Sequence, residues 1–259
     1  MHFKWHLLWL LLISCNPAPA NNKKGVSAQA SGKASQENNV VGNIADIPLP
    51  TGFSRVSFPQ NSFAAWLRKI NLKEDKTVYL YDGQLKRNQQ AQYAVLDISI
   101  GERNLQQCAD AVMRLRAEYL YAQKKFDSLK FIDNEGGVYT FQKPYTRTYF
   151  DSYLQKVFGI CGSASLARQM QIQNWNSIEP GDVIIRGGFP GHAVTIMDIA
   201  KNEKGEVIYL LSQSYMPAQS IHILKNPVNE DLSPWYIVND EAFIQTPEYT
   251  FKREELKQW

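Results

Sequence analysis

The first 46 residues most constrain what this chain can fold into, because we expect none of them to join the packed core. An apolar run from Leu7 to Ile13 lies near the N-terminus and ends at Ser14 and Cys15. It is too short to span a bilayer, which takes about 20 apolar residues, but it has the length of a signal-peptide core. Residues 16–45 are poor in large apolar side chains and cannot bury enough surface to offset the entropy of ordering. The folded part is therefore expected to begin near Ile47.

The residues Leu12–Cys15 closely resemble the lipobox of bacterial lipoproteins, in which a peptidase cuts before a cysteine whose thiol has been diacylated. The resemblance implies a signal peptide at 1–14, a lipidated flexible tether at 15–46, and a membrane partner held through lipid on Cys15. Acyl chains contribute about 0.8 kcal/mol per buried methylene, so the anchor would be durable. Asn16 after Cys15 favours the outer membrane of the cell envelope, facing the periplasm. The alternative is an ordinary secretory signal cut near Ala18 or Ala20.

Composition narrows the kind of domain that residues 47–259 can form and the partners that it can bind. The chain is 44% hydrophobic and 12% aromatic, which predicts a packed core. A net charge of +3 without a basic run gives no reason to expect nucleic acid as a partner. Outside the signal the only histidines are His192 and His222, and neither CxxC nor HxxxH occurs, so we expect no metal site and no cofactor.

Hydrophobic periodicity predicts helices followed by strands. One amphipathic helix runs from an Asn104 cap to about Lys125, and a second begins near Thr148 and breaks at the glycines around Cys161, with a new helix at or just after Cys161. Strands are predicted at 77–81, 93–100, 183–185, 192–200, 207–214, 219–224 and 235–238. We predict an α+β fold with a single domain at 47–259. The alternative is two lobes, at 47–147 and 148–259.

Two cysteines fall in the folded part, and the sequence leaves open whether they form a disulfide or remain thiols. Cys108 shares a helical stripe with Val112, Leu115 and Tyr119, so we interpret it as a core residue. Cys161 stands at a predicted helix start, where a thiol pKa is lowered and backbone donors can bind an oxyanion. Cys161 is therefore the stronger candidate for chemistry.

The residues after Cys161 include a histidine and then a glutamine, in the order found in some cysteine hydrolases. His192 opens a strand after a glycine turn, and Gln213 lies late in the next strand. This order resembles the papain-like cell-wall hydrolases, including the cysteine- and histidine-dependent amidohydrolase/peptidase class. The resemblance implies a papain-like arrangement of helices packed on an antiparallel sheet. It also implies that Cys161 is the nucleophile, His192 the base and Gln213 the group that orients the imidazole.

The spacing of the two strands supports half of this site. Period two puts Val194, Ile196 and Asp198 on the face of His192. If residues 202–205 form a four-residue loop, Lys201 faces Glu206 and Val194 faces Gln213, which makes His192 and Gln213 diagonal neighbours.

Other assignments remain open. Ile160 and Gly162 replace the acidic residue and serine that commonly flank the cysteine in such hydrolases. Matching Cys161–Ala164 to the Cys-Gly-Ser-Cys stretch of papain puts Ala164 at the catalytic position. Ser163 or Ser165 is a third choice of nucleophile, and Gln219 or His222 could orient the imidazole.

A second resemblance covers nearly the whole folded part. The chain resembles a group of bacterial lipoprotein domains known as domain of unknown function 4846, a family without an established activity. The resemblance lies in Pro50–Phe53, Ala64–Arg68, Val95–Ile98, Gln107–Ala111, Arg114–Tyr119, Gly187–Val194 and Gln213–Gln219.

Two functions are compatible with these patterns. The first is a cysteine amidase or peptidase acting on peptidoglycan stem peptides or another periplasmic amide. The second is a non-catalytic envelope module that binds a cell-wall fragment or a periplasmic protein. In both cases, loop residues near His192 would contact the ligand. The candidates are Arg186, Phe189, Tyr215, Met216 and Gln219.

Overall fold

The computed structural model describes residues 42–259, which belong to one compact unit. The predicted signal peptide, Cys15 and most of the predicted tether lie outside the described residues. The folded part begins earlier than the predicted Ile47, because Ile44 is completely buried and packs in a cluster with Leu67 and Leu72. Ile44 forms a 3-10 turn with only two other residues, Ala45 and Asp46, which is too short a segment for hydrophobic patterning to reveal its burial.

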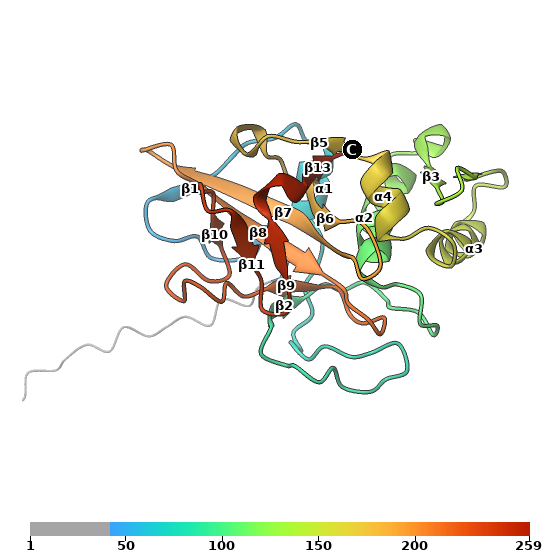
Figure 1. Cartoon of the computed structure of the whole chain (residues 1–259), viewed down its shortest axis with the longest axis horizontal. Helices are drawn as coiled ribbons and strands as arrows, with labels where there is room; N and C mark the ends of the chain where they lie inside the picture. The colour runs from blue at the N-terminus through green and yellow to red at the C-terminus, as the bar shows by residue number, and fades with distance from the viewer. Residues whose placement is uncertain (1–41) are drawn as a thin grey trace, which may run out of the picture. The chain divides into compact units, whose positions relative to one another are not determined.

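A nine-stranded antiparallel sheet dominates the fold, with β7 and β8 as its long central strands (Figure 1). Its main path runs β2-β9-β8-β7-β6-β13-β5, while β1 pairs with β7 and β10 with β8. The strands of this sheet are β1 (Phe53–Arg55), β2 (Gln92–Val95), β5 (Gln171–Ile172), β6 (Val183–Arg186), β7 (His192–Asn202), β8 (Val207–Gln213), β9 (His222–Leu224), β10 (Tyr236–Ile237) and β13 (Leu256–Gln258).

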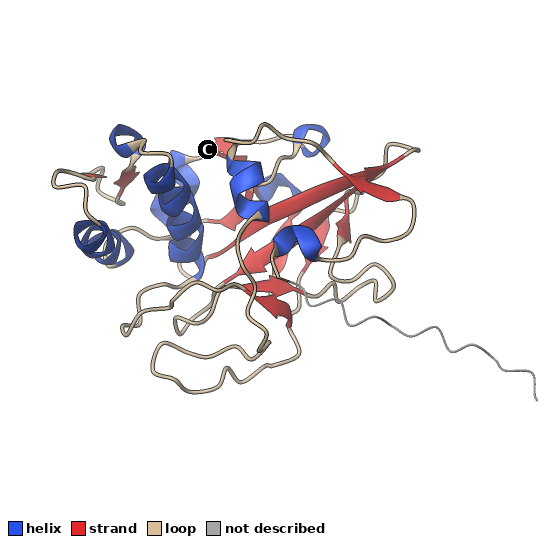
Figure 2. Cartoon of the chain, turned by 180° about the vertical axis from the view of Figure 1, so that it is seen from behind, coloured by secondary structure: helices blue, strands red, loops and turns tan. Residues whose placement is uncertain are grey.

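Two small hairpins and a few short helices complete the structure. The hairpins pair β3 (Lys130–Ile132) with β4 (Val138–Thr140) and β11 (Phe243–Gln245) with β12 (Thr250–Lys252). The helices are α1 (Phe63–Arg68), α2 (Cys108–Ala122), α3 (Arg147–Phe158) and α4 (Ser163–Gln169), with 3-10 turns η1 (Ile44–Asp46), η2 (Phe126–Ser128), η3 (Trp175–Ser177) and η4 (Arg253–Glu255). Helices α2, α3 and α4 gather toward one end of the sheet (Figures 1 and 2).

The predicted fold, an α+β arrangement of helices packed on a sheet as in papain, is therefore wrong. The structure is mostly antiparallel sheet with few short helices. Strands β1, β5 and β13 contain two or three residues each, too few to show a period-two pattern. Backbone hydrogen bonds nevertheless pair these strands with the sheet. In segments of two or three residues, the pattern of side chains does not predict such pairing.

Helix α2 begins at Cys108, four residues later than its predicted cap at Asn104. The Asn104 side chain does not cap the helix, because its Oδ1 accepts a hydrogen bond from the Ala218 amide at 2.7 Å. Asp110 instead accepts a hydrogen bond from the Gln107 amide at 3.0 Å, which fixes the helix start. Cys108 is consequently the first residue of a helix that packs against β7.

A β-bulge between Ile196 and Asp198 sets the register of the central strands. Lys201 pairs with Val207 rather than with the predicted Glu206, but the bulge absorbs one residue and Thr195 pairs with Ser212. Val194 therefore lies opposite Gln213, as predicted. Asp198 is turned to the face opposite His192, contrary to the prediction, and binds Arg55 at 2.7 Å and Arg68 at 2.6 Å.

Candidate functional site

His192 and Gln213 meet at the same end of the β7–β8 pair. His192 is the first residue of β7 and Gln213 the last of β8, and His192 Nε2 lies 2.9 Å from Gln213 Oε1. Both side chains are buried. The structure thus confirms the pairing of these two residues that the strand spacing predicted.

A third residue fixes which nitrogen of His192 carries the proton. Gln213 Nε2 donates to Glu248 Oε2 at 2.7 Å, and a carboxylate can only accept. The carbonyl oxygen of Gln213 must then face His192 and accept from its Nε2–H. The unprotonated Nδ1 is left as an acceptor, and it has no hydrogen-bond partner among residues 42–259.

The network continues beyond Glu248. Lys86 Nζ lies 2.6 Å from Glu248 Oε2, and burial lowers the pKa of Lys86. His222 pairs with Gln213 across β8 and β9, with its Nε2 3.4 Å from Gln213 Nε2 and its Nδ1 bonded to Ser220 O at 2.8 Å. His222 therefore supports Gln213 rather than competing with it for His192.

Aromatic rings surround the imidazole of His192. Its ring centroid lies 4.6 Å from that of Tyr215, 4.9 Å from that of Tyr249 and 5.6 Å from that of Phe251. Burial lowers the pKa of His192 to about 4. The hydrogen bond to Gln213 raises this pKa but offsets the effect of burial only in part. His192 is consequently neutral at physiological pH and able to accept a proton.

Cys108 lies beside the start of β7. Burial raises the pKa of its thiol to about 11, although hydrogen bonds from the backbone amides of Ala109 and Ala193 act in the opposite direction. Ala193 directly follows His192, so the sulfur contacts the same end of β7 that carries the imidazole. Burial thus leaves the Cys108 thiol neutral, and its sulfur contacts the backbone of the residue next to His192.

Cys161 is elsewhere in the core. It lies between α3 and α4, its amide donates to Val157 O at 2.8 Å, and only 6% of its surface is exposed. Burial raises its thiol pKa to about 11, with further contributions from Asp133 and Asp110. Within the described part of the chain no hydrogen bond joins it to His192, and both Cys108 and Cys161 are free thiols.

Ser163, Ser165 and Gln219, the alternative nucleophiles and orienting group, form hydrogen bonds to other groups than the imidazole. Ser163 donates to Gly188 O at 3.2 Å and Ser165 to Gly162 O at 3.1 Å. Gln219 is buried, and its Nε2 lies 3.4 Å from Pro217 O. None of the three hydrogen-bonds to His192 within residues 42–259.

Four of the five predicted ligand-binding residues lie on or near the end of the β7–β8 pair that holds His192. Arg186 binds Glu255 at 2.6 Å and stacks on Tyr249, which in turn packs on His192. Phe189 and Met216, in the loops beside His192 and Gln213, are 88% and 51% exposed, and Tyr215 packs on the imidazole. Gln219 is instead buried.

The sequence analysis missed two parts of this site. Glu248, Tyr249 and Phe251 belong to the C-terminal hairpin region, for which no element was predicted. Cys108 is buried, as predicted for a core residue, but its position as the first residue of α2 was missed because the helix was predicted to begin at Asn104. The sequence did contain a signal for this helix start. Asp110 is an acidic residue three positions after Gln107, a spacing that indicates Gln107 as the cap and Cys108 as the first helical residue.

Two further observations limit the kind of site. Among residues 42–259 there is no group of three histidine, cysteine, aspartate or glutamate side chains arranged to hold a metal ion. In the same range, no helix has the length and apolar character needed to cross a membrane.

Comparison with known proteins identifies the family. The family described as "Domain of unknown function (4846)" matches residues 44–143 and 138–258, which together span almost all described residues. The chain therefore belongs to this family. No curated protein and no solved structure matches it.

Proposed function

We propose that this domain is a cysteine-dependent hydrolase of amide bonds, with Cys108 as nucleophile, His192 as base and Gln213 as the group that orients the imidazole. The observation that carries the proposal is the geometry at the start of β7. His192 Nδ1 has no hydrogen-bond partner among residues 42–259, and the backbone amide of the next residue, Ala193, contacts the Cys108 sulfur. We propose Cys108 rather than Cys161 as the nucleophile because, within residues 42–259, Cys161 has no hydrogen bond to His192 or to the strand residue beside it. Nucleophile, base and orienting group are the three parts that such chemistry requires.

The reaction follows from these positions. Cys108 Sγ bonds to the amide carbonyl carbon while its proton passes to His192 Nδ1, and the carbonyl π electrons move to the oxygen. Amide N–H groups in the first turn of α2 lack intrahelical acceptors and can stabilise this oxyanion. Collapse expels the amine with the proton from His192. Water then attacks the thioester, loses its proton to Nδ1, and releases the acid and the thiol.

Peptide amides of the cell envelope are the proposed substrate class. The lipobox-like segment that ends at Cys15 supports an extracytoplasmic location, where peptidoglycan stem peptides are the abundant amides. The exposed Phe189 and Met216 beside the paired strand ends offer apolar contacts for a peptide chain.

The test is hydrolysis of a stem-peptide mixture by the full chain, followed by mass spectrometry. Cys108→Ala and His192→Ala should abolish product formation, whereas the matched control Cys161→Ala should retain it. Loss of activity in Cys161→Ala with activity retained in Cys108→Ala would refute the assignment of the nucleophile. Circular dichroism of each variant shows whether the fold persists.

A non-catalytic binding module is the second candidate, and one observation favours it. Burial leaves both the Cys108 thiol and the His192 imidazole uncharged, so the pair is not pre-ionised. Such a module would bind a cell-wall fragment or a periplasmic protein through the exposed loops. It predicts that stem peptides bind equally well to the wild type and to Cys108→Ala, without product.

We also infer that lipid on Cys15 holds the protein on a membrane, as an outer-membrane lipoprotein that faces the periplasm. The support is the sequence around Cys15 and the uncharged Asn16 after it. Detergent-phase partitioning of the expressed chain tests this directly. The wild type should enter the detergent phase and Cys15→Ala should not, whereas equal partitioning would exclude a lipid anchor at this residue.

A further inference from the structure

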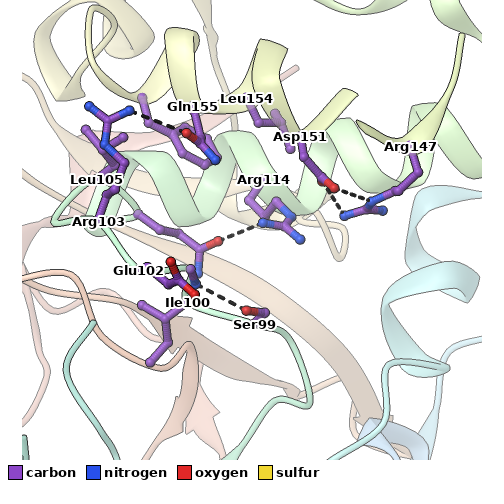
Figure 3. A pocket seen from close by; sticks show the side chains of 13 residues that line it. Ser99, Ile100, Glu102, Arg103, Leu105, Arg114, Arg147, Asp151, Leu154 and Gln155 are labelled. Carbon is purple, nitrogen blue, oxygen red and sulfur yellow. Dashed lines mark hydrogen bonds and ion pairs between the residues drawn. The ribbon is translucent and has the colours of Figure 1, made fainter. Parts of the chain in front are cut away.

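A cavity of about 270 Å³ opens between the loop of residues 99–106, the start of α2, and α3 (Figure 3). Figure 3 shows Arg114 between two pairs, Arg103 with Gln155 on one side and Arg147 with Asp151 on the other. The apolar side chains of Leu105, Leu154 and Phe158 form part of the lining. The cavity thus combines apolar surface with an unusual number of guanidinium groups.

Gln106 lines this cavity and carries a polar group without a partner. The side chain is only 1% exposed, and its Oε1 accepts a hydrogen bond from Arg114 Nη1 at 3.1 Å. A guanidinium has no acceptor, so this bond fixes the orientation of the amide and leaves the two hydrogens of Nε2 unused. Gln106 Nε2 is one of five buried side-chain atoms of residues 42–259 that have no hydrogen-bond partner. Leaving a buried donor unpaired costs free energy, which a ligand acceptor would recover.

The neighbouring arginines supply donors rather than acceptors. Arg114 uses Nε for Glu118 at 2.7 Å and Nη1 for Gln106, and Nη2 has no hydrogen bond to residues 42–259. Arg147 is already paired with Glu118 and Asp151, so it contributes little free charge. Arg103 is exposed and makes only a long bond of 3.4 Å to Gln155. The unused groups of Gln106 and Arg114 therefore lack an acceptor within residues 42–259, whereas the exposed Arg103 can be solvated. The carboxylates of Glu102 and Asp151 also lie in the lining, and Asp151 is paired with Arg147.

We infer that this cavity binds the carboxylate of a small ligand with an apolar body. Two planar donor groups, the Gln106 amide and the Arg114 guanidinium, match the two oxygens of one carboxylate, while the leucine and phenylalanine side chains contact the body. A free carboxylic acid and the C-terminal carboxylate of a peptide share this chemistry. The inference does not depend on the thiol reaction, because no residue of that site takes part.

Isothermal titration of the full chain with matched pairs of compounds tests the inference. N-acetylleucine is compared with N-acetylleucinamide, and hexanoate with hexanamide, so that only the carboxylate differs within a pair. At least one carboxylate should bind, and its amide should bind more weakly by about tenfold or more, the size of one charge-assisted hydrogen bond. Preference for N-acetylleucine would indicate a peptide C-terminus, and equal binding of hexanoate a free acid. Absence of saturable binding by both carboxylates, or equal binding of acid and amide, would overturn the inference.

Variants link the binding to the named groups. Gln106→Met removes the unpaired amide with little change of volume and should weaken carboxylate binding by about tenfold. Arg103→Gln, at an exposed position, provides a second test if Gln106→Met does not fold. Arg168→Gln in α4 is the matched control, since Arg168 binds Asn134 outside the cavity. Unchanged affinity in both Gln106→Met and Arg103→Gln would show that the carboxylate binds outside this cavity, which would overturn the inference.

Discussion

The chemistry of His192 depends on the orientation of a single neighbouring amide. Glu248 accepts from Gln213 Nε2, so Gln213 Oε1 must face the imidazole and the proton of His192 resides on Nε2. Nδ1 then remains a base directed away from Gln213. Burial holds the pKa of His192 at about 4, which keeps this base uncharged across the physiological range.

The pH dependence of hydrolysis follows from that pKa. Because the proposed mechanism uses the neutral imidazole as its base, kcat/KM should stay constant from about pH 9 down to about pH 5. Below the His192 pKa of about 4 it should fall about tenfold per pH unit. The measurement is a pH–rate profile, with circular dichroism at each pH to show that the protein remains folded. A bell-shaped profile centred near neutrality would indicate a pre-ionised thiolate–imidazolium pair instead.

Asp110 carries a second unusual group near the start of α2. Burial raises the pKa of its carboxyl well above the ordinary value, and its Oδ1 is buried without a partner. A carboxyl with a raised folded-state pKa makes the protein less stable as pH rises above the ordinary value, because the charge must form in a buried place.

Asp110→Asn should therefore increase the free energy of unfolding. The expected gain is about 1–3 kcal/mol at pH 8, the cost of one unpaired buried group, and it should be smaller at pH 5, which lies closer to the ordinary carboxyl pKa. Urea denaturation of both proteins at the two pH values measures it. A loss of stability that is equal at both pH values would mean that the carboxyl itself is needed.

At the scale of elements, the bulge in β7 lets one strand serve two purposes. Before it, His192, Val194 and Ile196 share a face with the proposed site, and Asp198 after it points to the opposite face. There the completely buried carboxylate of Asp198 binds Arg55 of β1 and Arg68 of α1. A single residue thus joins two elements from the N-terminal part of the domain to the central strand.

Asp198→Ala should weaken this junction strongly. It leaves two largely buried guanidinium groups without a counter-charge, so the free energy of unfolding should fall by about 3–5 kcal/mol. The control is Glu254→Ala, because Glu254 pairs with Lys252 at 3.4 Å on the exposed surface and should change stability by about 0.5 kcal/mol or less. Chemical denaturation of both variants distinguishes the two cases. Equal, small effects would show that the Asp198 bonds do not hold β1 and α1.

The same elements show how far the sequence could predict the structure. Elements with clear periodicity, such as α3 and the β7–β8 hairpin, were predicted close to their observed bounds, and the hairpin spacing correctly paired His192 with Gln213. Short strands such as β5 and β13 were missed because they contain too few residues to show a period. The start of α2 was placed wrongly for a different reason: Asn104 has the side chain of a helix cap, but its oxygen accepts a hydrogen bond from the distant Ala218 amide instead. Such a bond between distant segments leaves no local signal.

At the scale of the whole molecule, the proposed site is assembled from four distant segments. Cys108 comes from α2, His192 and Gln213 from the central hairpin, Glu248 from the turn of the C-terminal hairpin, and Lys86 from the loop before β2. None of these segments contains a complete set of reacting groups. The chemistry therefore requires the intact fold, and the family match across almost all described residues agrees with a single functional unit.

The most direct test of the central claim is to trap the covalent intermediate. The full chain is mixed with an activated peptide ester, quenched with acid within milliseconds to seconds, and mapped by peptide mass spectrometry. We expect an acyl thioester on Cys108 that disappears in Cys108→Ala and persists in Cys161→Ala. Acylation of Cys161 alone, or no acylation of either thiol, would contradict the assignment of Cys108 as the nucleophile.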